Sequence, residues 1–416
     1  MSTTNHDNDS MKILFIHQHF YPEESGTAKS CTEMAVYFAE KGHDVTVITE
    51  FPNRGFKSTS DHNQSPLRRL DTHKGIAIHR LRNKFKYSSN TVSRISAYLM
   101  FTLGSVIYAL RMAQRFDLCI TIQALPSAIP GVVLQKLHKI PHHFYCTDMM
   151  PDLGIVSGMI QNRIIIRVAR AVEKLVYDHS TAVHAVTKQM VENIKSKSSN
   201  SNIFELPDWL DDRFFNAYRY QFTDYLKKTY GLENKRVILY IGNIGFVQNL
   251  KIVVDAAKLI AGQEGYENCL FIIGGGGVQK ETLEKECIDS GLENIRFIGV
   301  VARKHVPSFL ELSSALVMNY MDHPHMALYR SSKIFDYIVA EKPVIVGATG
   351  ALKDIVEQNG LGYVASPSDP EEFANKLMTL LDEKRTLNNR DLISQYSREN
   401  VLDRFARRIL TMEIRN

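Results

Sequence analysis

The segment from Ser331 to Ile345, SSKIFDYIVAEKPVI, combines a cation, a carboxylate and a helical pattern. Its apolar residues recur at helical spacing, so it predicts a short amphipathic helix that a buried strand follows. Lys333 on the first turn would place a cation beside the positive end of the helix dipole, a geometry that a diphosphate favours. Asp336, about one turn further on, could accept hydrogen bonds from sugar hydroxyls. An ordinary amphipathic helix with exposed charges is the alternative interpretation.

Glycine-containing turns follow three of the predicted strands. Ser25-Gly26-Thr27 comes after the first strand of the N-terminal half, and Gly242 to Gly245 comes after the first strand of the C-terminal half. The turn from Gly274 to Gly277 lacks the third glycine of a G-x-G-x-x-G fingerprint. Ligands of open α/β sheets bind at the carboxyl ends of strands, so one such turn in each half predicts a ligand held between the halves. Turns that bind nothing are the alternative.

A carboxylate cluster follows another predicted strand, in the segment Thr147 to Asp152, TDMMPD. Asp148 could orient a sugar hydroxyl at the carboxyl end of that strand. The alternative is a helix N-cap, because Asp close to Pro often begins a helix. The sequence contains no paired-cysteine, H-E-x-x-H or G-x-S-x-G motif, so it predicts neither a metal site nor a serine nucleophile.

Apolar runs alternate with helical patterns along the chain, which predicts two parallel α/β domains. The expected divisions are a disordered tail over 1–10, an N-terminal domain over 11–212, a linker over 213–232, a C-terminal domain over 233–395, and a final amphipathic helix over 396–416 that crosses back to the N-terminal domain. The expected strands are Lys12–His17, Val45–Thr49, Ile76–Leu81, Leu118–Ile122, His143–Cys146, Ala182–Ala185, Val237–Ile241, Leu270–Ile273, Ile295–Ile298, Ala315–Met318 and Val344–Val346.

Composition is consistent with this division. The 416 residues are too many for one ordinary core and fit two domains. A hydrophobic fraction of 44% with 23% charged residues is typical of a globular protein and excludes a disordered chain. The five cysteines are scattered, which favours a reducing compartment. The polar N-terminus does not resemble a signal peptide, so we expect a cytoplasmic protein.

The net charge of +5 is unevenly distributed. Residues 1–205 carry 24 Lys and Arg against 17 Asp and Glu, and the basic residues crowd between positions 54 and 94. Such a patch attracts an anionic partner, either a membrane surface or nucleic acid, although a solvated charged face needs no partner. We assign a membrane or acceptor patch to Arg68, Arg69, Arg80, Arg82, Lys84 and Lys86.

The apolar segment from Arg94 to Arg115 follows this patch and comes near the length of about 20 residues that spans a membrane. Polar residues interrupt it, and it falls between two strands of one domain. We therefore expect a largely buried helix with one face toward lipid.

Taken in order, these segments resemble the retaining family-4 glycosyltransferases of the GT-B fold, and bacterial members that build surface polysaccharides in particular. The resemblance covers nearly the whole chain after residue 11. In the N-terminal half it rests on HQHFYPEESGTA, EKGHDVTVIT, FYCTDMMPDLG and LPDWLD. In the C-terminal half it rests on LYIGNIGFVQNL, FIIGGGGVQ, ENIRFIGVV, SSKIFDYIVAEKPVI and GLGYVASPSDPEEFANKL.

The resemblance implies two facing Rossmann-like domains with an interdomain cleft, a nucleotide-sugar donor held mainly by the C-terminal domain, and an acceptor held mainly by the N-terminal domain. It also implies sugar transfer with retention and without a required metal or other cofactor. The catalytic candidates are Lys333, which would stabilise the diphosphate, and Asp148, which would position the sugar or acceptor. The donor-binding candidates are Gly26, Gly242, Asn243, Gly274, Gly275, Arg330, Ser332, Lys333 and Asp336.

Two positions depart from the family pattern. The family has a glutamate, seven residues and a second glutamate, whereas this chain has Leu328 and Asp336. The lysine that usually follows the second-domain glycine loop is replaced by Gln248, which leaves Lys333 with Arg330 as the phosphate cations.

We therefore expect a glycosyltransferase that moves a sugar, with a UDP-sugar favoured as donor, to a saccharide or lipid-linked saccharide in polysaccharide biosynthesis. Peripheral membrane contact at the inner face is expected, and a nucleic-acid partner is not. A sugar-nucleotide epimerase of the same fold would convert a nucleotide sugar without an acceptor. A non-catalytic partner protein, which Leu328 favours slightly, would bind the nucleotide sugar and transfer nothing.

Overall fold

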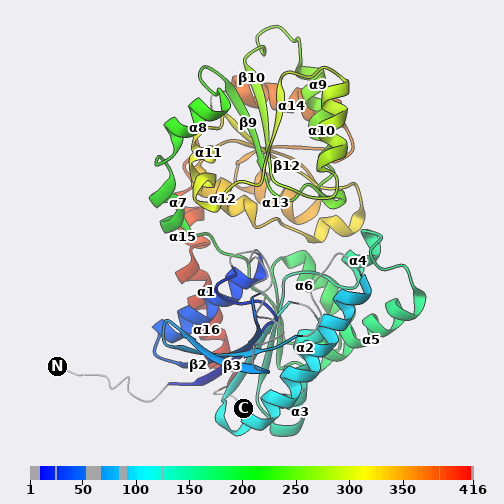
Figure 1. Ribbon diagram of the computed structural model, residues 1–416, viewed down its shortest axis with the longest axis vertical. Coiled ribbons are helices and arrows are strands. Elements are labelled where there is room, and N and C mark those ends of the chain that lie inside the picture. Colours follow the sequence, from blue (N-terminus) through cyan, green and yellow to red (C-terminus); the bar gives the residue numbers. More distant parts are fainter. Residues whose placement is uncertain are drawn as a thin grey trace, which may run out of the picture. The chain divides into compact units, whose positions relative to one another are not determined.

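The structure is a computed structural model that describes residues 10–23, 26–52, 67–83, 91–123, 125–383 and 385–413. The chain divides into two compact units, of which the first comprises Met1–Leu206 with Leu402–Asn416 and the second comprises Pro207–Val401. Each unit is an α/β structure built around its own sheet (Figure 1).

The first unit contains an eight-stranded sheet in the order β3-β4-β2-β1-β5-β6-β7-β8. All neighbouring strands are parallel except β3, which pairs antiparallel with β4 at one edge. The strands are β1 (Lys12–Ile16), β2 (Asp44–Glu50), β3 (Arg68–His73), β4 (Ile76–Leu81), β5 (Leu118–Ile122), β6 (His142–Cys146), β7 (Ala182–Ala185) and β8 (Ile203–Glu205). The helices are α1 (Thr27–Glu40), α2 (Thr91–Met112), η2 (Ala113–Arg115), α3 (Leu125–His138), α4 (Asp152–Val156), α5 (Arg163–His179), α6 (Lys188–Lys195) and α16 (Arg398–Glu413).

Helices cover both faces of this sheet. Leu14 and Ile16 of β1 share a buried cluster with side chains of α2 and α3. Phe15, between them, contacts Phe38 of α1, and Phe38 in turn contacts Phe405 of α16. Because successive strand residues point to opposite faces, α2 and α3 cover one face while α1 and α16 cover the other. Burial on both faces explains why the central strands are almost continuously apolar.

The second unit contains a six-stranded, all-parallel sheet in the order β11-β10-β9-β12-β13-β14. Leu239 of β9 belongs to one core cluster, whereas its neighbours Ile238 and Tyr240 belong to the other, so this sheet is also covered on both faces. The strands are β9 (Arg236–Ile241), β10 (Cys269–Gly274), β11 (Ile295–Gly299), β12 (Ala315–Asn319), β13 (Val344–Gly347) and β14 (Gly362–Ala365). The helices are α7 (Asp212–Tyr218), α8 (Thr223–Tyr230), η3 (Phe246–Gln248), α9 (Lys251–Ile260), α10 (Lys280–Asp289), η4 (Arg303–His305), α11 (Val306–Leu312), η5 (Pro324–Leu328), α12 (Lys333–Ala340), α13 (Gly350–Gln358), α14 (Pro370–Asp382) and α15 (Arg390–Gln395).

Each expected strand is present, and its ends differ from the expected ends by at most one residue. Three strands have no counterpart in the sequence-based prediction, namely β3, β8 and β14. Strand β3 is an exposed edge strand of polar sequence, β8 has only 3 residues, and β14 begins with glycine, so none of them carries a long apolar run.

The segment expected to be a linker, 213–232, is largely helical, and the division between the units falls earlier, after Leu206. Phe215 of α7 and Leu226 of α8 are buried in the same core cluster as Leu232. Few residues of this segment face inward, so its composition is polar on average. For this reason the sequence-based prediction missed its two short amphipathic helices. The expected tail over 1–10 lies almost entirely outside the described residues.

Helix α16 begins in the second unit, and its residues from Leu402 onward belong to the first. The ring of Phe405 also contacts the buried ring of His184 on β7, with centroids 4.8 Å apart. Arg408 donates to the carbonyl oxygen of Glu205 on β8 at 3.3 Å. These contacts attach the end of the chain to the first sheet.

Helix α2 coincides with the long apolar segment of the sequence. The segment Ser96–Arg115, which comprises most of α2 together with η2, is long and apolar enough to cross a bilayer, the single such segment among the described residues. It also packs against the sheet of the first unit, where Phe101, Tyr108 and Ala109 are buried. Its inner side is therefore part of a protein core, which length and apolarity alone do not reveal.

Arg80 does not belong to an exposed basic patch, contrary to the sequence-based assignment. Only 2% of Arg80 is exposed, because it shares the inward-facing positions of β4 with Ile76 and Ile78. Its Nε lies 2.5 Å from a carboxylate oxygen of Asp71, and its Nη1 donates to the carbonyl oxygen of Glu50 at 3.2 Å. Arg68 and Arg69 are exposed and Arg82 is half-buried, while Lys84 and Lys86 lie outside the described residues.

We predict that Arg80→Ala destabilises the first unit by about 3 kcal/mol, since it removes one partner of a buried ion pair. Arg69→Ala is the matched control, because Arg69 contacts the same Asp71 carboxylate from an exposed position and should contribute less than about 1 kcal/mol. Urea unfolding followed by circular dichroism measures both differences. Equal effects of the two substitutions would contradict the burial of Arg80.

The destabilisation caused by Arg80→Ala should depend on pH through the Asp71 carboxylate. Burial alone would raise the pKa of Asp71, but hydrogen bonds and charge from Arg69 and Arg80 outweigh it and hold that pKa below its ordinary value. A carboxylate with a lowered pKa stabilises the fold above its unfolded pKa and loses that contribution as the pH falls through the folded pKa. The cost of Arg80→Ala should therefore shrink in acid, below the ordinary pKa of 3.8.

Candidate functional site

Two glycine loops of the second unit lie against each other at the carboxyl ends of β9 and β10. The N–H of Gly242 donates to the carbonyl oxygen of Gly274 at 2.9 Å, and the N–H of Ile244 donates to that of Gly276 at 2.8 Å. Gly275 has φ +137°, and a Cβ atom there would overlap the carbonyl oxygen of Gly242. Only glycine fits such a conformation and such a close approach. Three of the glycines predicted to bind the donor, Gly242, Gly274 and Gly275, therefore meet in one place, whereas Gly26 belongs to the first unit.

Lys333, the first residue of α12, reaches the same place from a distant part of the chain. A Cβ atom at Gly242 would lie 2.8 Å from Lys333 Nζ and closer still to Cε, so the lysine side chain occupies the space above that glycine. Lys333 Nζ also lies 5.9 Å from the centre of the Tyr240 ring. The hydroxyl of Tyr240 donates to the carbonyl oxygen of Asn243 at 2.6 Å and so fixes the loop. The structure thus brings together Gly242, Asn243, Gly274, Gly275 and Lys333.

The charge of Lys333 is partly desolvated. Burial lowers its pKa from the ordinary value of 10.5, and the nearby Asp336 carboxylate opposes this shift. Among the described residues, no carboxylate lies within ion-pair distance of Lys333 Nζ. A bound phosphate would supply the anion that a half-buried ammonium lacks, and low local dielectric strengthens such a pair.

The first turn of α12 has further exposed polar groups. Ser332 is exposed at the N-cap position, and its side chain makes no capping hydrogen bond to the helix. Asp336 is exposed on the same turn as Lys333. A helix N-terminus favours anions, so this end of α12 suits a diphosphate.

Arg330 lies differently from the expected phosphate cation. Its guanidinium group is 5.2 Å from the centre of the Phe335 ring and 5.5 Å from that of Tyr396, so both aromatic faces hold it. Leu328, at the position of the missing family glutamate, ends η5 and is half-buried. Lys333 therefore remains the cation that lies over the glycine loops.

Gln248 has a structural contact where the family pattern has a lysine. Its Oε1 accepts hydrogen bonds from the side-chain amide of Asn243 at 3.0 Å and from the backbone N–H of Gly245 at 3.2 Å. The residue holds the glycine loop instead of presenting a charge. The sequence did not reveal this role, although a glutamine three residues after a loop glycine is a known capping pattern.

In the first unit, Asp148 follows β6 as expected, but it is not the N-cap of α4. That helix begins at Asp152, and its N-cap residue is Pro151. The Asp148 carboxylate instead accepts a hydrogen bond from the side-chain amide of Gln123, which follows the neighbouring strand β5. Gly26 has φ +51° at the start of α1, with open space beside it. Both residues lie at the carboxyl edge of the sheet, the usual place for ligands.

A partly buried ion network lies next to the loop that contains Asp148. Lys197 Nζ lies 2.5 Å from an oxygen of Asp152 and 3.0 Å from an oxygen of Glu173 on α5, while Arg170 binds the other oxygen of Asp152 at 3.0 Å. Burial raises the pKa of Glu173, and Lys197 opposes that shift. These residues come from separate segments, so the sequence offered no signal that they would meet.

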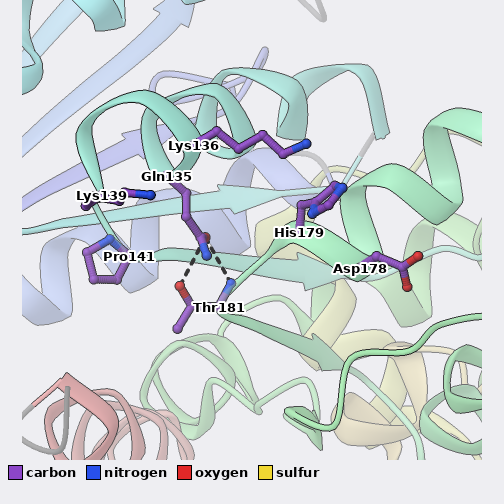
Figure 2. Close-up of a pocket in the computed structure, with 7 residues that line it drawn as sticks. All are labelled: Gln135, Lys136, Lys139, Pro141, Asp178, His179 and Thr181. Atoms are coloured by element: carbon purple, nitrogen blue, oxygen red, sulfur yellow. Dashed lines mark hydrogen bonds between the residues drawn. The ribbon is translucent and has the colours of Figure 1, made fainter.

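A cavity of about 410 Å³ lies at the opposite edge of the first sheet (Figure 2). It is lined by Gln135, Lys136, Lys139, Pro141, Asp178, His179 and Thr181. Pro141 and Thr181 immediately precede β6 and β7, so the cavity opens at the amino ends of these strands. It therefore lies away from Asp148 and Gly26.

The described residues contain no group of three His, Cys, Asp or Glu side chains that could hold a metal ion. The polar groups gathered over the glycine loops of the second unit are a lysine, a tyrosine and amides. This set suits hydrogen bonding to an anionic ligand.

Comparisons with known proteins show the family of this chain. The family model for the glycosyl transferase 4-like domain matches residues 25–202, and the model for glycosyl transferases group 1 matches residues 223–400. WcaI of Escherichia coli (strain K12), described as a colanic acid biosynthesis glycosyl transferase, is 27% identical over 311 residues, which cover 73% of this chain and 75% of WcaI. N-acetyl-alpha-D-glucosaminyl L-malate synthase of Bacillus anthracis is 20% identical over 405 residues, which cover 92% and 91% of the two chains.

Solved structures resemble the whole chain. Sucrose-phosphate synthase of Thermosynechococcus elongatus has a TM-score of 0.76 at 15% identity, with 98% of this chain and 100% of that chain covered. HepE of Anabaena, solved with UDP-glucose, has a TM-score of 0.69 at 16% identity, with 96% and 100% covered. At such identities the likeness establishes the fold alone. Since the family models match both halves in order, the chain belongs to the glycosyltransferases of the GT-B fold that join a glycosyl transferase 4-like domain to a group 1 domain.

Proposed function

We propose that this enzyme transfers a sugar, with retention, from a nucleotide diphosphate donor to a saccharide or lipid-linked saccharide acceptor in polysaccharide biosynthesis. One observation carries the proposal: the Lys333 ammonium group lies over Gly242, beside the N-terminus of α12. A UDP-sugar is the favoured donor, since HepE of similar fold was solved with UDP-glucose. The polysaccharide role follows the description of WcaI.

In this proposal the chemistry is mainly stabilisation of the charge that develops on the leaving diphosphate. Lys333 and the backbone N–H groups at the start of α12 supply that stabilisation, and no metal or other cofactor is required. Asp336 holds the ribose. Asp148, oriented by Gln123, positions the reactive sugar or the acceptor. The enzyme works in the cytoplasm, at the inner face of the membrane.

Lys333→Ala tests the phosphate contact directly. Loss of a charge-assisted hydrogen bond costs about 1.5–3 kcal/mol, so the affinity for UDP should fall by about one to two decades. Lys353→Ala, which changes an exposed lysine of the nearby helix α13, is the control and should leave the affinity unchanged. Isothermal titration with UDP and GDP measures both variants. If Lys333→Ala binds whichever diphosphate the wild type prefers with full affinity, the assignment is wrong.

Gly242→Ala tests whether the glycine is needed to admit the lysine. The added methyl group would collide with Lys333, so UDP binding should weaken about as much as in Lys333→Ala. The double variant should be no weaker than either single variant, because both remove one contact. Gly276→Ala is the control in the neighbouring loop, where a Cβ atom meets only Val300 at an ordinary 3.5 Å. Additive losses in the double variant would show that the two residues act independently.

Asp336 should distinguish ribose from 2′-deoxyribose through hydrogen bonds to vicinal hydroxyls. Each such bond to a charged group is worth about 1.5–3 kcal/mol, so the wild type should prefer the ribonucleotide by roughly ten- to a hundredfold. Asp336→Asn should reduce this preference and Asp336→Ala should nearly abolish it, while Asp336→Glu asks whether one more methylene fits. Competition between UDP and its 2′-deoxy analogue measures the ratio. If the ratio of affinities for UDP and its 2′-deoxy analogue is the same in all four proteins, Asp336 does not contact the ribose.

A further inference from the structure

The outer surface of the first unit has an unusual composition on the face covered by α2, α3 and α5. Helix α3 packs against both α2 and α5, so the three helices form one layer over the sheet (Figure 1). Helices α2 and α3 contain no Asp or Glu. Helix α5 contains two, of which Glu173 is buried and Asp178 pairs with Lys174 at 2.8 Å.

Helix α5 has two parallel stripes on its exposed side. Ile164, Val168, Ala171 and Leu175 recur at the helical repeat and form an apolar stripe, on the side opposite the buried Glu173. Of these, Ile164 is 73% exposed and Val168 is 58% exposed. A second, basic stripe consists of Arg163, Arg167, Arg170 and Lys174. Each of these residues immediately precedes a residue of the apolar stripe in the sequence.

Two of the four cations in this basic stripe pair with a carboxylate of the same unit. Arg170 pairs with Asp152 and Lys174 pairs with Asp178. Within the described part of the chain, no carboxylate lies within ion-pair distance of Arg163 or Arg167. A monomer in water gains nothing from several exposed large apolar residues beside unpaired cations.

The other two helices of the layer extend the same surface. Leu99, Leu103 and Ile107 of α2 recur every four residues and are each more than half exposed, as is Leu137 of α3. The basic residues Arg111, Arg115, Lys136 and Lys139 are exposed at the ends of these helices. Lys136 and Lys139 also line the cavity of Figure 2.

We propose that the layer of α2, α3 and α5 binds an anionic lipid membrane, with α5 lying in the interface. An interfacial helix combines an apolar stripe that enters the acyl boundary with adjacent Lys or Arg that contact anionic headgroups. The absence of exposed, unpaired carboxylates on the three helices favours a negatively charged partner over a mixed protein surface. The inference deepens the proposed lipid-linked acceptor by naming the surface that meets the bilayer, and it uses none of the residues of the donor site.

Vesicle flotation of the full chain, without donor or acceptor, tests this inference. The wild type should float with vesicles of phosphatidylcholine mixed with one quarter phosphatidylglycerol, and much less with phosphatidylcholine alone. Ile164→Ser with Val168→Ser should reduce the bound fraction about tenfold or more. Arg163→Gln with Arg167→Gln should reduce it on the order of tenfold at low salt and leave a smaller salt dependence.

Two control pairs match these variants. Val278→Ser with Ile288→Ser removes equally exposed apolar residues from the second unit, and Arg404→Gln with Arg407→Gln removes exposed charges from α16, on the other face of the first sheet. Both control pairs should bind vesicles as the wild type does. Thermal unfolding and UDP titration of every variant verify the fold, and they keep a failure of the donor assignment separate from a failure of this one.

Three outcomes would overturn the inference. In the first, the wild type binds neither type of vesicle. In the second, the α5 variants bind vesicles as well as the wild type does. In the third, Arg69→Gln with Arg82→Gln would abolish binding that the α5 variants retain, which would place the contact on the β3–β4 hairpin.

Discussion

The backbone-to-backbone contact between the two glycine loops is the constraint on which the proposed donor site depends. Gly242 and Gly275 approach so closely that neither tolerates a side chain, and the space left above Gly242 is filled by the aliphatic stem of Lys333. The lysine is held over the loops by packing, and its ammonium group is partly removed from water. Tyr240 and Gln248 then fix the loop through hydrogen bonds to the backbone and the side chain of Asn243. A charge held in this way would need little reorganisation to bind a phosphate, as the proposed function requires.

The first unit achieves positional control differently, with buried polar pairs instead of glycine contacts. Asp148 is bound by Gln123 from the adjacent strand end, and the loop beyond it is tied to α5 and to Lys197 by ion pairs. Arg80 and Asp71 join the edge hairpin in the same manner. Such pairs contribute little net stability but are costly to break one partner at a time, so they specify geometry.

Much of this architecture could be predicted from the sequence, because its central strands are apolar runs and its turns carry glycine. The convergence of Lys333 with Gly242 was predictable only through the resemblance to a family, since the two residues are far apart in the chain. The partners Gln123, Tyr240 and Gln248 could not be foreseen, because a hydrogen bond between side chains depends on strand order and rotamer. Arg80 was misassigned although its alternation with Ile76 and Ile78 marked it as inward-facing. The two helices of the segment 213–232 were missed because the composition of the segment is polar on average.

Helix α5 has one further consequence. Its inner side carries Glu173, which binds Lys197 and through it Asp152 at the start of α4, while its outer side faces the surroundings. One rigid helix of 17 residues therefore makes contacts on two opposite sides. An insertion or deletion of a single residue would rotate the helix by about 100° and misalign both sides together. Point changes on the outer side leave the inner register intact, so the surface of this enzyme is free to diversify through substitution while the length of α5 is not.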